Sequence, residues 1–75
     1  EKSSLYETIL VSINDKLVEL FLDNKIKFTD ISKKMHNILN LKELKKYKMI
    51  KPKKVKEIIN LSKKIKNKVE LIVNS

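Results

Sequence analysis

Three carboxylates in the first third of the chain have a spacing that could serve metal chemistry. Asp15, Glu19 and Asp23 lie four residues apart, so on a helix they form a single stripe. Hard cations such as Ca²⁺ and Mg²⁺ take oxygen ligands that converge from a loop or from several elements. One helical stripe does not provide that convergence. We therefore interpret these residues as a solvated face and assign no metal ligand.

His36 is the only histidine and falls beside an apolar helical stripe. The sequence places no serine, cysteine or carboxylate to work with it, so we interpret it as a boundary residue rather than a catalytic base. With one histidine and no cysteine, a structural zinc site is not expected. The chain also lacks glycine, which excludes phosphate loops built on that residue. We predict no catalytic, cofactor-binding or metal-binding residue, and no enzyme complete in this segment.

The charge is strongly basic and unevenly distributed. The 75 residues carry a net charge of +9, and all 18 basic residues are lysine. Residues 1–24 hold two lysines against five carboxylates, a net −3, whereas residues 25–75 hold sixteen lysines against four, a net +12. The two ends could attract each other, or the acidic face could meet a separate partner.

The lysine content has two interpretations. One is the composition of an AT-rich genome, which enriches lysine, asparagine and isoleucine together. The other is a surface that binds nucleic acid or another polyanion. Base-specific recognition relies on arginine, which is absent here, and the four aromatic residues are too scattered to stack bases.

The apolar spacing predicts a single all-α domain over residues 1–75. Helical periodicity runs over 5–23, where Ser4 and Glu7 form a capping-box signal, and over 30–39. A short third helix is one interpretation of residues 40–52, and Pro52 suits the start of a last helix over 53–73. No apolar run reaches about 18 residues, so no membrane span is predicted. We expect three or four helices in an antiparallel bundle.

The last helix is basic and amphipathic, and three interpretations of its apolar stripe stay open. The stripe could lie on an anionic membrane, enter a groove of nucleic acid, or form the core face of a small bundle. Core packing is the usual role of such a stripe.

The connection between the first two helices has the strongest local signal. Asn24 stands where the chain turns, and asparagine tolerates the left-handed conformation that ends helices. Ile26 and Phe28 alternate with lysines, which predicts a short extended link with both apolar side chains in the core. Thr29 is predicted to cap the next helix, and Asp30 to favour its N-terminus.

The predicted core follows from these assignments. Replacing Phe21 or Phe28 with alanine should cost about 3–5 kcal/mol if the ring is fully buried. The predicted core residues are Ile9, Ile13, Leu17, Phe21, Ile26, Phe28, Ile31, Met35, Ile38, Val55, Ile58, Ile59, Ile65 and Val69.

Residues 10–39 closely resemble part of the C-terminal helical domain of the 1-deoxy-D-xylulose 5-phosphate (DXP) reductoisomerase family. Ser12-Ile13-Asn14-Asp15 stands where that family has A-A-N-E, and Leu20-Phe21-Leu22 stands at A-F-L. The segment Ile26–Ile31 matches I-x-F-T-D-I in full. Many members place glycine where Asn24 and Lys25 stand here. The family's Asp and Ala-Arg pair in the last helix is matched weakly, by Ser62 and Ile65-Lys66.

The residues on which the resemblance rests are structural rather than catalytic. The residues of this structural motif are Asn14, Asp15, Phe21, Ile26, Phe28, Thr29, Asp30 and Ile31. None of these positions does chemistry in the family pattern, so the motif identifies ancestry rather than a reactive site.

The resemblance implies a larger parent enzyme. Such an enzyme would use NADPH and a divalent metal, Mg²⁺ or Mn²⁺, to convert DXP to 2-C-methyl-D-erythritol 4-phosphate in isoprenoid biosynthesis. It would be a homodimer of the bacterial cytoplasm or of a plastid-type organelle, with its cofactor and metal sites in other domains. This segment would then be a scaffold packed against those domains. The alternative is a free-standing lysine-rich module that binds nucleic acid or another polyanion.

Overall fold

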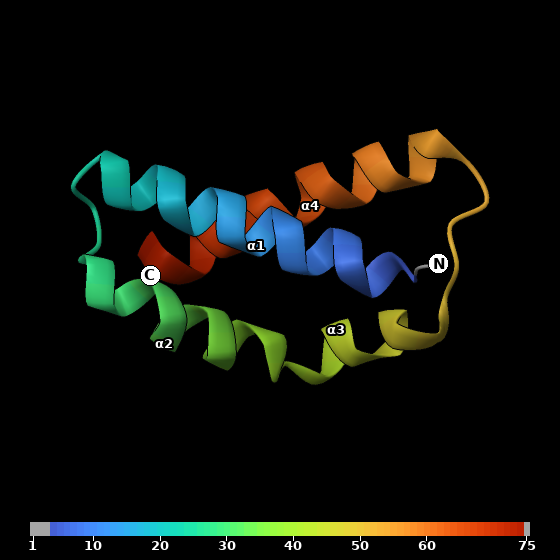
Figure 1. Cartoon of the computed structure of the whole chain (residues 1–75), viewed down its shortest axis with the longest axis horizontal. Helices are drawn as coiled ribbons and strands as arrows, with labels where there is room; N and C mark the ends of the chain where they lie inside the picture. Colours follow the sequence, from blue (N-terminus) through green and yellow to red (C-terminus); the bar gives the residue numbers. More distant parts are fainter. Residues whose placement is uncertain (1–3, 75) are drawn as a thin grey trace.

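The computed structural model describes residues 4–74, which form four α-helices and one 3-10 helix with no strand among them (Figure 1). The all-α prediction is confirmed. The elements in chain order are α1 (Leu5–Leu22), α2 (Phe28–Leu39), α3 (Lys42–Lys45), η1 (Lys46–Met49) and α4 (Val55–Asn74).

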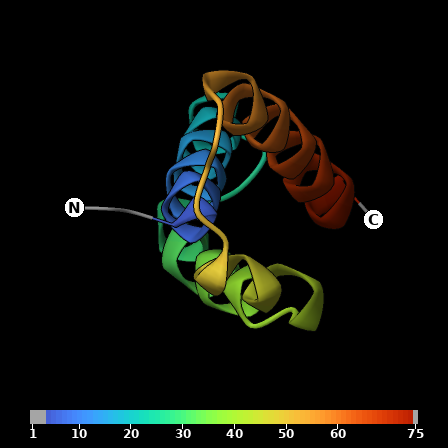
Figure 2. The same cartoon turned by 90° about the vertical axis from the view of Figure 1, so that its right-hand side faces the viewer.

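Helix α1 is the central element and packs against α2, α3, η1 and α4. The tight turn after α1 makes α2 run antiparallel to it (Figure 1). Helix α4 instead runs in the same direction as α1. Ser12 contacts Ser62, and Lys16, further along α1, contacts Glu70, which is further along α4. The chain reaches the start of α4 through η1 and an extended link over residues 50–54 that crosses beside the beginning of α1 (Figure 2).

Local hydrogen bonds fix where the long helices begin. The Ser4 side chain accepts the backbone N–H of Tyr6 at 3.2 Å, so Ser4 caps α1 as predicted. The backbone N–H of Lys53 donates to a Glu57 carboxylate oxygen at 2.9 Å, just before α4 begins. The N–H of Leu5 donates to the carbonyl of Ile50 at 2.7 Å, which ties the start of α1 to the extended link.

The core lies between α1 and the other helices. Ile9, Ile13 and Leu17 are fully buried on α1, and Ile65 and Val69 cover them from α4. All five were predicted. The complete set of buried apolar residues in the described chain is Leu5, Ile9, Ile13, Leu17, Leu20, Ile38, Leu44, Leu61, Ile65 and Val69, and Ile26, Ile31, Met35 and Ile58 pack half-buried against them.

Three core predictions are wrong. Phe28 is 71% exposed because α2 begins at this residue, earlier than predicted, and its ring points outward. Val55 is 71% exposed because it is the first residue of α4. Ile59 is 49% exposed because Leu61 faces the core, and residues two apart lie on different sides of a helix. Phe21 is half-buried rather than buried.

Within residues 4–74, no helix combines the length and the apolar character needed to cross a membrane.

Candidate functional site

The turn after α1 is closed by backbone hydrogen bonds. The N–H of Asn24 donates to the carbonyl of Phe21 at 3.0 Å, and the N–H of Lys25 donates to the carbonyl of Leu20 at 2.9 Å. These bonds satisfy carbonyls that the end of a helix leaves without intrahelical partners. Asn24 has φ 63°, so the predicted left-handed residue is confirmed.

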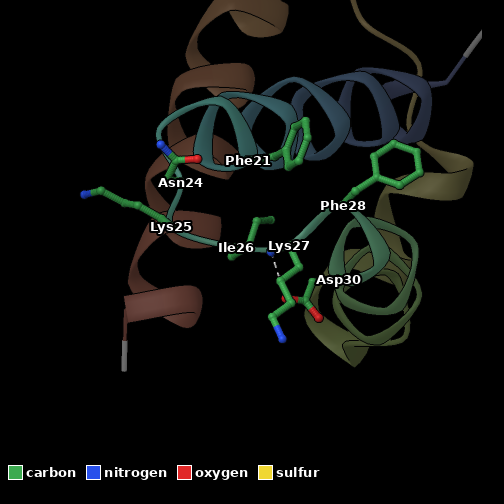
Figure 3. A pocket seen from close by; sticks show the side chains of 7 residues that line it. All are labelled: Phe21, Asn24, Lys25, Ile26, Lys27, Phe28 and Asp30. Carbon is green, nitrogen blue, oxygen red and sulfur yellow. Dashed lines mark hydrogen bonds between the residues drawn. The ribbon is translucent and has the colours of Figure 1, made fainter.

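Helix α2 begins with a different cap from the one predicted. Lys27 is the N-cap residue and Phe28 the first helical residue, so Thr29 already lies within the first turn and does not cap the helix. The Asp30 carboxylate instead reaches back and accepts the N–H of Lys27 at 3.0 Å (Figure 3). The N–H of Asp30 donates to the Lys27 carbonyl at 2.9 Å. The negative side chain also suits the positive end of the helix, as predicted.

Two aromatic rings meet beside this turn. Phe21 on α1 and Phe28 on α2 pack edge to face, with ring centroids 5.7 Å apart. An open hollow of about 570 Å³ lies here, and Figure 3 shows both rings together with the turn that joins their helices. The lining residues are Phe21, Asn24, Lys25, Ile26, Lys27, Phe28 and Asp30. Such a surface can hold an apolar side chain beside ammonium groups, but it presents no nucleophile.

The structural motif from the sequence separates into an inner and an outer part. Ile26 and Ile31 pack half-buried against the core. Asn14, Asp15 and Thr29 are exposed. The motif therefore both anchors the turn and shapes an outer surface that includes the half-buried Phe21 and the exposed Phe28.

The carboxylate stripe does not converge on a common point. Asp15, Glu19 and Asp23 are all exposed on α1. Among the described residues, no group of three or more histidine, cysteine or acidic side chains could hold a metal ion. The divalent metal implied by the family resemblance therefore has no ligand set in residues 4–74, and we assign it to no residue of this chain.

His36 lies on the exposed face of α2. Its Nε2 is 3.3 Å from the amide nitrogen of Asn40 on the following turn. An adjacent surface hollow is lined by Ser32, Lys33, His36 and Asn37. His36 lies in the last turns of α2 and Asn40 is the C-cap residue of the same helix, and among residues 4–74 no carboxylate orients the ring.

Lys16 forms an ion pair that joins α1 to α4. Lys16 Nζ lies 2.9 Å from Glu19 Oε2 on the same helix and 2.9 Å from Glu70 Oε1 on α4. Hydrogen bonds to Glu19 and then Glu70 raise the pKa of Lys16, while the hydrogen bond from Lys16 lowers the pKa of Glu70. A second ion pair joins Lys68 to Glu43 on α3 at 3.0 Å.

Comparison with known proteins decides the family. The family model described as "DXP reductoisomerase C-terminal domain" matches residues 1–68. The chain belongs to this family. It is 52% identical over 68 residues to the 1-deoxy-D-xylulose 5-phosphate reductoisomerase of Pelagibacter ubique, and the match covers 91% of this chain. It covers 18% of that relative, so the chain spans less than a fifth of the relative's length. No solved structure matches the chain.

Sequence reasoning did not identify the Lys16–Glu70 contact between two helices of this reductoisomerase C-terminal domain. The uneven charge suggested attraction between an acidic start and a basic remainder. The Lys16–Glu70 pair has the opposite polarity, with the lysine in the acidic half and the glutamate in the basic half. Residues 54 positions apart carry no local signal of pairing, so the sequence alone could not identify the contact.

Proposed function

We propose that this domain is a non-catalytic scaffold of an NADPH-dependent DXP reductoisomerase. The observation that carries the proposal is the family match over residues 1–68. Two observations support a scaffolding role: no group of three or more histidine, cysteine or acidic side chains in residues 4–74 could hold a metal ion, and the imidazole of His36 lies against the amide of Asn40. The free-standing polyanion-binding module is the weaker hypothesis, because it rests on lysine content alone.

The proposed parent enzyme rearranges DXP and reduces the product to 2-C-methyl-D-erythritol 4-phosphate, in the supply of isoprenoid precursors. In such an enzyme NADPH would supply a hydride, and Mg²⁺ or Mn²⁺ would supply Lewis-acid chemistry. We place both groups in the other domains of the parent. The residues described here would hold the shape of the enzyme without contacting either one.

We further propose that the parent is a homodimer of the bacterial cytoplasm. The named relative is bacterial, which supports that location over the plastid-type organelle expected as an alternative. The partners of this domain are then the remaining domains of its own parent chain.

The experiment is an activity assay on the full-length protein that carries this domain. DXP-dependent oxidation of NADPH would be measured for the wild type, for His36→Ala and for Glu19→Gln. Because neither side chain is assigned to chemistry, both variants should keep kcat within about twofold of wild type. No turnover of DXP by the wild type would reject the reductoisomerase assignment. A large fall in kcat for either folded variant would reject the non-catalytic role.

A further inference from the structure

The outward face of α1 carries an apolar stripe that the fold leaves uncovered. Val11, Val18 and Leu22 are 60%, 36% and 70% exposed. Spacings of seven and four residues place them on one side of the helix, opposite the side that buries Ile9 and Leu17. The outer face of a surface helix is normally polar. Apolar side chains on this face therefore suggest that another surface covers them.

The stripe continues onto α2 through the aromatic pair. Phe21 borders Leu22 on α1, and its ring packs against the exposed ring of Phe28. The open hollow at this pair adds a concave end to the apolar surface (Figure 3). We name Val11, Val18, Leu22, Phe21 and Phe28 the outer apolar face. Several large apolar side chains exposed on one side of a domain indicate an interaction site.

The charge beside the α1 part of the outer apolar face is acidic, whereas Lys25 and Lys27 line the hollow at its other end. Asp15 lies between Val11 and Val18 along the helix, and Asp23 follows Leu22; both are exposed. Lys16 is the only lysine within α1, and it is bonded to Glu70 on the opposite flank. The rest of the chain, residues 25–75, has a net charge of +12. A complementary partner surface would be apolar and bordered by lysine or arginine.

We propose that the outer apolar face docks this domain onto another domain of its parent enzyme, at an apolar surface that places basic side chains opposite Asp15 and Asp23. The proposal rests on the proposed function. The matched relative has most of its length outside this domain, since the aligned part is 18% of that protein. A second copy is a poorer occupant, because a two-fold interface uses the same patch on both copies and would place Asp15 and Asp23 of both copies in one interface.

A cysteine-labelling experiment tests the proposal with a closely matched control. Leu22 and Leu71 are 70% and 72% exposed in this domain, and both lie near the end of a long helix. Leu71 lies beyond the part that matches the family model. Leu22→Cys and Leu71→Cys would be introduced separately into the full-length protein. The 75 residues contain no native cysteine, so peptide-level mass spectrometry reports each new thiol without ambiguity.

Docking should make the thiol at position 22 react about tenfold or more slowly than the thiol at position 71 in the native protein. Urea should abolish the difference. Equal rates in the native protein would overturn the proposal. Protection at position 22 that disappears on dilution, together with a fall in sedimentation coefficient, would also overturn it in favour of a second copy.

A charge variant tests the acidic border. Asp15→Lys should increase the labelling rate at position 22, whereas Asp15→Asn should change it less, because only the lysine introduces repulsion toward a basic partner. If neither substitution changes the labelling rate at position 22, the proposal that the partner surface is basic is wrong. The activity assay separates this inference from the proposed function: protection without DXP turnover would reject the function alone, and turnover with equal labelling would reject the docking face alone.

Discussion

The hydroxyl of Ser12 on α1 donates a 2.8 Å hydrogen bond to the hydroxyl of Ser62 on α4. Ser12 is 2% exposed and is the one buried polar side chain among the described residues. Small side chains at a helix crossing allow the two backbones to approach closely. This pair joins the two longest helices at their shared interface.

The Ser12–Ser62 bond should show coupling in a double-mutant cycle. Ser12→Ala leaves Ser62 without its partner, and the reverse holds for Ser62→Ala, so each single variant should lose about 1 kcal/mol of unfolding free energy. The double variant should lose less than the sum, with a coupling of about 1 kcal/mol, in urea unfolding. Additive losses would mean that the hydroxyls contribute independently. As a steric control, Ser12→Leu should cost about 1–3 kcal/mol by forcing the helices apart.

The Lys16–Glu70 ion pair should make stability depend on pH. The pKa of Glu70 is held below its ordinary value of 4.5 by the hydrogen bond from Lys16. Its contribution is therefore present above pH 4.5 and is lost as the pH falls through the lowered pKa. The pKa of Lys16 is raised above 10.5, so its contribution is present below pH 10.5 and is lost as the pH rises through the raised pKa.

Chemical unfolding of the wild type and Glu70→Gln would check this dependence. The wild type should be more stable at about pH 7, and the difference should shrink at about pH 3. Glu19→Gln is the matched control, since it removes the partner of Lys16 within α1 and leaves the bond to α4 intact. That variant should keep the acid-dependent loss. A gap between wild type and Glu70→Gln that is unchanged in acid would contradict the assignment.

The buried and exposed faces of α1 should respond differently to the same substitution. Leu17 is fully buried, so Leu17→Ala should lower the unfolding free energy by about 2–5 kcal/mol. Leu22 is 70% exposed, so Leu22→Ala should change it by no more than about 0.5 kcal/mol when the 75-residue chain is unfolded alone. Thermal or urea unfolding by circular dichroism measures both. Similar losses would show that the two faces are wrongly assigned.

The exposed ring of Phe28 has a weaker expected effect in the same measurement. Phe28→Ala should cost about 0.5–1.5 kcal/mol, the value of an aromatic pair, because the ring contacts Phe21 but is 71% exposed. This corrects the 3–5 kcal/mol expected for a buried ring. A loss as large as that of Leu17→Ala would mean that Phe28 is covered in solution.

The left-handed residue of the first turn should prefer glycine to alanine. Asn24 has φ 63°, a conformation that costs a residue with a β-carbon about 1–2 kcal/mol. Asn24→Ala should therefore lower the unfolding free energy by about 1 kcal/mol, and Asn24→Gly should leave it nearly unchanged. Melting temperatures of the two variants would decide. Equal destabilisation by both would show that the asparagine side chain, rather than the backbone angle, matters.

Local signals in the sequence were sufficient to predict the helices. Apolar periodicity placed α1 and α4 to within two residues at each end, and Ser4 and Asn24 were assigned the roles they have in the structure. The start of α2 was predicted two residues late. Both Thr29 and Asp30 are plausible capping residues, and only the three-dimensional path of the chain decides that the Asp30 carboxylate reaches Lys27.

Side-chain exposure was harder to predict, because it depends on which helix covers which face. Alternation of apolar and basic residues placed Phe28 in the core, but a helical residue at that position points outward. Leu44 is buried although it belongs to a four-residue helix with little periodicity of its own. The outer apolar face was missed for the same reason: Val11, Val18 and Leu22 belong to the same apolar helix as the core stripe, and composition alone does not separate the two sides.

The parallel sense of α1 and α4 has a consequence for how the domain is made. Their contacts join residues as far apart as Ser12 and Ser62, fifty positions along the chain. During synthesis α1 leaves the ribosome first, and α2 covers only part of its apolar side. Val69, which is fully buried, emerges only after α1, α2 and the link that leads into α4. The core is complete only when translation of the domain is nearly finished. Until then α1 exposes apolar surface on both sides of the helix, which is the kind of surface that chaperones bind.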